Sequence, residues 1–109
     1  MNSQILVDKL GFIQRTALGK TVEIEGVYIG DLLSWVMGHA QSNQAWMTML
    51  GHPNIVAVSL LRELACIIVV EDAPIADATI EKADEEEFII FSTSLTSYEA
   101  AKLIATLQV

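Results

Sequence analysis

The strongest constraint on the fold is one uninterrupted apolar run, ACIIVV at residues 65–70, which is followed directly by two acidic residues. A run of this length, rich in β-branched side chains, is typical of a strand that is buried on both faces. Strands covered on both faces belong mostly to parallel sheets, whose crossover connections are usually helices. The run therefore predicts an α/β domain with helices on both faces of a sheet.

The segments around this strand alternate in the same way. Further strands are predicted at residues 12–17, 22–29, 45–50 and 88–92. Helices are predicted after Ser3 as N-cap, at 32–37 ending at Gly38, at 55–64, at 75–86, and after a capping box at 96–99. The part before residue 45 is more hairpin-like. We expect one domain, residues 1–109, with a mixed, mostly parallel sheet of about five strands flanked by helices.

Composition and charge exclude several classes of function. The chain is 52% hydrophobic and 18% charged, which argues against disorder, and its net charge is −8. Six Lys and Arg residues are scattered along it, so nucleic acid and anionic membranes are not expected partners. The mean hydropathy of +0.45 is high for a small domain and favours a homodimer or higher homo-oligomer.

Three features indicate a cytoplasmic location. Residues 1–11 lack the basic and apolar regions of a signal peptide. The longest apolar stretch, residues 55–70, is interrupted by Ser59, Arg62 and Glu63 and falls short of the roughly 18 apolar residues of a membrane span. Cys66 is the single cysteine, so the chain has no internal disulfide framework.

A candidate ligand site lies where the strands are expected to end. In open α/β sheets, ligands bind beyond the carboxyl ends of the strands. The polar residues that follow the predicted strands, and that we expect to bind a small molecule, are Tyr28, Asp31, Thr48, His52, Asn54, Thr93 and Ser94. If the last three strands are adjacent and parallel, the loops that carry His52, Glu71 and Ser94 share one edge.

Each of these residues also has a structural interpretation. Asp31 suits a helix N-cap, which we favour, and His52 can close a turn beside Pro53. Asn54 fits a cap or a turn, and the hydroxyl groups at 92–97 are ordinary for a loop that enters a helix. Free N–H groups in that loop can hold an anion, although Glu71 and Asp72 would oppose one.

Enzyme motifs are incomplete. Gly19-Lys20-Thr21 resembles the end of a P-loop, but Gln14 stands where that motif needs glycine, and no G-x-G-x-x-G occurs. His39 and His52 lack partners at metal-ligand spacing, and Ser34 lacks a nucleophile elbow. Cys66 lies inside the apolar run. The sequence therefore predicts neither catalysis nor a metal site, and it names no cofactor.

Much of the chain resembles the DRTGG domain family. The resemblance rests on YIGDLLSWVMG at 28–38, HPNIVAV at 52–58, ACIIV at 65–69, TIEKA at 79–83 and FST at 91–93. Residues 21–27, TVEIEGV, depart from the name-giving motif, keeping one glycine but not the second glycine, the arginine or the aspartate. The family occurs alone, between paired CBS domains and in phosphotransacetylases. It is similar to the N-terminal domain of HPr kinase/phosphorylase, which lacks the kinase P-loop.

The resemblance implies an α/β regulatory or ligand-binding module, often oligomeric. The leading hypothesis is thus a non-catalytic sensor of a small metabolite or nucleotide. The alternative is a homo-oligomeric interaction module without a small ligand, using Trp35, Val36, Met37, Trp46, Met47 and Met49, although core packing is the favoured use of most of these residues. A small enzyme, with His52 as acid or base and Asp31 orienting it, is the third hypothesis.

Overall fold

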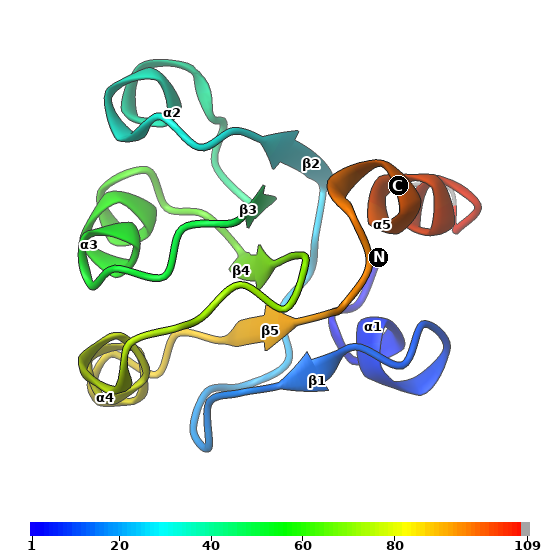
Figure 1. Ribbon diagram of the computed structural model, residues 1–109, viewed down its shortest axis with the longest axis horizontal. Helices are drawn as coiled ribbons and strands as arrows, with labels where there is room; N and C mark the ends of the chain where they lie inside the picture. The colour runs from blue at the N-terminus through cyan, green and yellow to red at the C-terminus, as the bar shows by residue number, and fades with distance from the viewer. Residues whose placement is uncertain (108–109) are drawn as a thin grey trace.

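The computed structural model describes residues 1–107, and these form one five-stranded sheet with helices on both faces (Figure 1). The strands lie in the order β1-β5-β4-β3-β2. Their bounds are β1 Ile13–Gln14, β2 Gly26–Ile29, β3 Gln44–Thr48, β4 Cys66–Val69 and β5 Ile90–Ser92. The four strands β2 to β5 are parallel, and β1 pairs antiparallel with β5. The prediction of a mixed, mostly parallel sheet is confirmed.

The helices divide between the two faces. Figure 1 shows α2 (Leu33–His39), α3 (Asn54–Leu61) and α4 (Asp77–Glu85) on one side, and α1 (Gln4–Asp8) and α5 (Ser97–Ala105) on the other. Each step from β2 to β5 moves to the next strand in the same direction, and right-handed crossovers therefore place all three connecting helices on one face. Within residues 1–107, no helix has the length and apolar character needed to cross a membrane.

The central strand β4 shows how the core is built. All four of its residues are fully buried, because successive side chains point to opposite faces and both faces are covered. Cys66 and Ile68 join the cluster beneath α1 and α5, with Leu6, Phe91 and others. Ile67 and Val69 join the cluster beneath α2, α3 and α4. The prediction made from residues 65–70 is confirmed.

The expected hairpin in the first part of the chain is wrong. β1 and β2 lie at opposite edges of the sheet. The chain after β1 is held to the far edge instead, because Arg15 N–H donates to the Ile90 carbonyl at 2.8 Å. The backbone N–H groups of Ala17 and Leu18 both donate to Asp84 Oδ1 at 2.9 Å. These contacts span about seventy residues of sequence, so local patterning does not predict them.

Two helix ends also differ from expectation. Ser3 does not cap α1 with its side chain; its hydroxyl accepts from the Val22 N–H at 3.0 Å and thereby ties residues 22–24 to the amino-terminal segment. As a result β2 begins at Gly26 rather than at residue 22. Gly38 does not end α2, which runs on to His39.

The capping box of α5 is confirmed. Glu99 N–H donates to Thr96 Oγ1 at 3.2 Å, and Thr96 N–H donates to Glu99 Oε1 at 3.0 Å. Hydrogen bonds from Thr96, above all from its backbone, lower the pKa of the Glu99 carboxyl. This end of the helix is therefore satisfied by its own residues.

Candidate functional site

The carboxyl ends of β3, β4 and β5 lie side by side. Thr48 is in register with Val69, and Val69 with Ser92. The loops that follow these strands, together with the loop after β2, therefore form one edge of the sheet, which we call the carboxyl edge. The juxtaposition expected for the loops of His52, Glu71 and Ser94 is present.

Asp31 and Thr48 are in direct contact at this edge. Thr48 Oγ1 donates to Asp31 Oδ1 at 2.7 Å, and the Met49 N–H donates to the same oxygen at 2.9 Å. The favoured interpretation of Asp31 as an N-cap is wrong, because Leu32 occupies the N-cap position of α2 and no side chain caps it. Asp31 instead anchors the β2–α2 loop to the end of β3, with its second carboxylate oxygen directed to no protein donor among residues 1–107.

His52 and Asn54 share one turn. The Asn54 N–H donates to His52 Nδ1 at 3.1 Å, so Nε2 carries the proton of the neutral ring. The interpretation of His52 as a turn residue is confirmed. Asn54 is the first residue of α3 after Pro53, and its side chain makes no cap. Both side chains are exposed, which leaves His52 Nε2–H and the Asn54 amide accessible at the carboxyl edge.

The connections of β4 and β5 leave on opposite faces, toward α4 and α5. A divergence of this kind ordinarily opens a crevice between two strand ends. Here a tight turn fills it: Glu71 and Asp72 have φ of 60° and 51°, and Ala73 N–H donates to the Val70 carbonyl at 3.1 Å. Glu71 N–H donates to Leu95 O at 2.8 Å and Asp72 N–H to Thr93 O at 3.0 Å. In the strand order this turn lies between the loop of His52 and the loop of Thr93 and Ser94.

Tyr28 lies within β2 rather than in a loop of the carboxyl edge. It is partly buried and packs against the cluster beneath α2, α3 and α4. Its ring approaches Gly30 so closely that a Cβ built there would lie 3.2 Å from Tyr28 Cε1. Its role in ligand binding remains a prediction, as do the roles of the other six residues.

Trp46 was absent from the predicted site, and Ser92 was noted only among the hydroxyl groups at 92–97. Trp46, fully buried, donates from Nε1 to the Gly30 carbonyl at 2.8 Å and so supports the β2–α2 loop. Ser92 is only 5% exposed, and its hydroxyl lies on the same face of the sheet as that of Thr48. The sequence gives no sign that an indole inside an apolar strand will contact a loop. Ser92 is the only residue of its strand with a hydroxyl group, and this marks it in the sequence as a candidate site residue.

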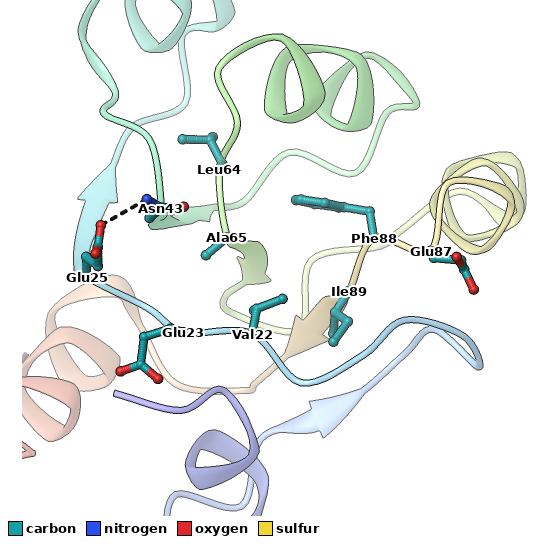
Figure 2. Close-up of a pocket in the computed structure, with 9 residues that line it drawn as sticks. All are labelled: Val22, Glu23, Glu25, Asn43, Leu64, Ala65, Glu87, Phe88 and Ile89. Carbon is teal, nitrogen blue, oxygen red and sulfur yellow. Dashed lines mark hydrogen bonds between the residues drawn. The ribbon is translucent and has the colours of Figure 1, made fainter.

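A hollow lies at the opposite edge, where the parallel strands begin. This cavity, about 430 Å³, was not predicted. It is lined by Val22, Glu23, Glu25, Asn43, Leu64, Ala65, Glu87, Phe88 and Ile89 (Figure 2). Its walls come from four separate segments, so no single stretch of sequence signals it. We refer to it as the amino-edge cavity.

Both edges of the sheet carry acidic side chains. The carboxyl edge carries Asp31, Glu71 and Asp72, and its loops at 30–32, 49–53, 70–76 and 93–96 contain no Lys or Arg.

Among the residues that the structure describes, no group of three His, Cys, Asp or Glu residues is placed to hold a metal ion. Burial raises the pKa of the Cys66 thiol to about 12, which keeps it in the unreactive protonated form.

Comparisons with known proteins show the fold only. The chain matches no protein-family model and no curated protein. It is similar to the CBS and DRTGG domain structure from the regulatory region of a Clostridium perfringens pyrophosphatase, complexed with the activator diadenosine tetraphosphate. The TM-score is 0.71 at 16% identity, over 93% of this chain and 44% of that one. The chain thus spans less than half the length of that structure and shares a related fold with part of it.

Proposed function

We propose that this chain is a non-catalytic regulatory module of the DRTGG type, which senses a small metabolite or nucleotide at the carboxyl edge. The observation that carries the proposal is the set of polar groups left accessible there: the second oxygen of Asp31, Nε2–H of His52 and the side-chain amide of Asn54. The fold similarity to a pyrophosphatase regulatory region supports it.

The accessible groups indicate which part of a ligand they bind. A carboxylate oxygen accepts from hydroxyl or amino groups, the imidazole N–H donates, and an amide does both. The edge loops carry three carboxylates and no Lys or Arg, which disfavours phosphate. We therefore expect recognition of a heterocycle or of sugar hydroxyls, with any phosphate directed toward solvent.

The same groups do not make a catalytic set. The His52 ring receives the Asn54 backbone N–H at Nδ1, and it forms no hydrogen bond with a hydroxyl or thiol nucleophile in residues 1–107. Nucleophilic catalysis needs that pairing. The Cys66 thiol lies in the middle of the sheet and is inaccessible to substrate.

Binding is tested by titrating the ¹⁵N-labelled protein with nucleosides, nucleotides including diadenosine tetraphosphate, amino acids and sugars. A true ligand perturbs amide signals of residues 30–32, 48–54 and 92–95. In a thermal-shift assay, a ligand at 100 times its Kd adds about 2.7 kcal/mol to the stability of the folded form. If no compound perturbs these residues, or if perturbations map only to the opposite edge, the proposal fails.

Matched variants locate the contact. Asn54→Ala and Ser94→Ala remove exposed side chains that make no hydrogen bond within the described residues, so we expect both to fold normally. Each should weaken binding, whereas Ser42→Ala, an exposed serine at the other end of the strands, should leave it unchanged. Equal affinity in all three variants would contradict the assignment.

A second candidate, a homo-oligomeric interaction module, is favoured by exposed apolar side chains near the end of β2. Of the residues considered for an interface, Val36, Trp46 and Met47 are buried in the core, which is the use favoured for most of these residues. Trp35 and Met49 are 59% and 45% exposed, and Ile29 and Leu32 are exposed as well. Light scattering tests this candidate: it requires a dimer or larger species that Trp35→Ser dissociates, and a monomer at all concentrations would exclude it.

A further inference from the structure

We propose that the amino-edge cavity binds an organic cation that carries an apolar body, such as an arylalkylamine. The cavity of about 430 Å³ lies within the range of roughly 300–1,000 Å³ that small-molecule sites occupy. It lies at the opposite end of the parallel strands from the carboxyl edge, so this site is independent of the function proposed above.

The floor of the cavity is apolar. Leu64, Ala65, Phe88 and Ile89 are each less than a tenth exposed, and Val22 adds a fifth apolar side chain to the lining from the segment that precedes β2. Figure 2 shows the Phe88 ring extending toward Ala65, while Val22 and Ile89 face each other. An aromatic or aliphatic group placed among these side chains would leave water for an apolar surface, which is the main source of affinity for an uncharged body.

The mouth of the cavity is acidic. Glu25 Oε2 accepts from Asn43 Nδ2 at 3.0 Å, a bond that fixes the carboxylate beside the opening and leaves Oε1 available (Figure 2). Glu23 Oε1 already accepts from the Met1 amino nitrogen at 2.6 Å. The carboxylate of Glu87 points away from the cavity in Figure 2. Glu25 is therefore the residue expected to contact the charge of a ligand.

Charge selects the class of ligand. None of the nine lining residues is Lys, Arg or His, and the net charge of the whole chain is −8. The Met1 amino group is a cation beside the mouth but is already paired with Glu23, so an anion would still be repelled by Glu25, and a neutral molecule would gain nothing from that charge. An ammonium or guanidinium group at the mouth gains attraction to Glu25 while its apolar body occupies the floor.

The test uses three probes of one shape: 2-phenylethylamine, the neutral 2-phenylethanol and the anionic 3-phenylpropionate. Titrated into the ¹⁵N-labelled protein at pH 7, the amine should bind most tightly and perturb residues 22–25, 43–44, 64–65 and 87–89. Glu25→Gln keeps an oxygen for Asn43 but removes the charge, and should weaken amine binding about fivefold. Glu81→Gln, an exposed charge-matched change on α4, should have no effect.

Several outcomes would overturn the proposal. They are equal binding of the three probes, perturbations outside the cavity, no binding of the amine, or unchanged affinity in Glu25→Gln. A cavity-filling variant, Val22→Phe, should abolish amine binding; if it does not fold, Glu25→Gln with its Glu81→Gln control still decides. A ligand at the carboxyl edge would leave residues 22–25 unperturbed, so failure here and failure of the sensor function are distinguishable.

Discussion

At the scale of single residues, Asp31 shows how a loop side chain can be structural and available at once. One of its oxygens accepts from Thr48 and Met49, while the other accepts from no donor among residues 1–107. Thr48 is 1% exposed, so its hydroxyl depends on Asp31 as its acceptor. A ligand that binds to the second oxygen of Asp31 would therefore also affect how firmly the β2–α2 loop is held to the end of β3.

We predict that Asp31→Ala destabilises the protein by about 1–3 kcal/mol, because it leaves the buried Thr48 hydroxyl without an acceptor. Asp31→Asn keeps one oxygen and should cost less. Urea unfolding of the two variants and the parent protein measures both values. An Asp31→Ala protein as stable as the parent would mean that the contact contributes nothing to folding.

The burial of Cys66 makes the stability of the folded protein decrease as the pH rises above 9. Its pKa rises from 9.0 to about 12 on burial, so the unfolded chain forms the thiolate at lower pH than the folded one. The stability due to the neutral thiol is fully present below pH 9 and is lost as pH rises from 9 toward 12, by about 1.4 kcal/mol per pH unit. The measurement is the difference in unfolding free energy between the parent and Cys66→Ala from pH 8 to pH 10.5.

Cys66→Ala serves as its own control here, because all other titrating groups are common to the two proteins. The parent should lose stability relative to the variant only above pH 9. In the native parent, the same thiol should also react with a maleimide only at the rate at which the sheet opens. A difference that does not change with pH would show that the thiol reaches solvent without unfolding.

At the scale of elements, the carboxyl edge is closed by loop-on-loop contacts. Thr79 Oγ1 donates to the Gly51 carbonyl at 2.6 Å, and Ala76 N–H donates to the same oxygen at 3.1 Å. The β3–α3 loop and the start of α4 are thus held together. This contact and the hydrogen bonds of the turn at Glu71 and Asp72 hold these loops together at the carboxyl edge.

Two glycine substitutions should have opposite effects. A Cβ at Gly51 would lie 2.0 Å from the Pro74 carbonyl oxygen, so Gly51→Ala must push the loops apart, at a cost of about 1–3 kcal/mol. Gly38 lies inside α2 with no atom within 4 Å of a built Cβ. Gly38→Ala should therefore stabilise the protein by about 0.5–1 kcal/mol. Thermal unfolding of the two variants measures whether each substitution raises or lowers the stability. Destabilisation by Gly38→Ala would contradict the space found around a Cβ at this position.

At the scale of the whole molecule, stability should decrease from the centre of the sheet to its edges. β4 is buried completely and flanked by β3 and β5, whereas the two residues of β1 are exposed. Native-state hydrogen exchange should give the slowest rates for amides of β4 and much faster ones for β1. Uniform protection across the sheet would indicate that the molecule opens only as a unit.

Elements whose signals are local could be predicted from the amino-acid sequence. The run at 65–70 specified a buried strand, the alternation after residue 45 specified parallel pairing, and the Thr96 and Glu99 side chains specified the start of α5. Each depends on neighbours within a few residues or on strand burial, which periodicity encodes. The same rules placed the loops of Asp31, His52 and Ser94 at one edge.

Long-range packing sets which strands lie at the edges of the sheet, how the loops contact one another, and where the cavity lies. β1 joins β5 through contacts with residues 84–92, and the Glu71–Asp72 turn adopts positive φ values without glycine because its amides bond to residues 93 and 95. The amino-edge cavity exists where four distant segments fail to fill a common space. Such features follow from long-range packing, which no local pattern in the chain records.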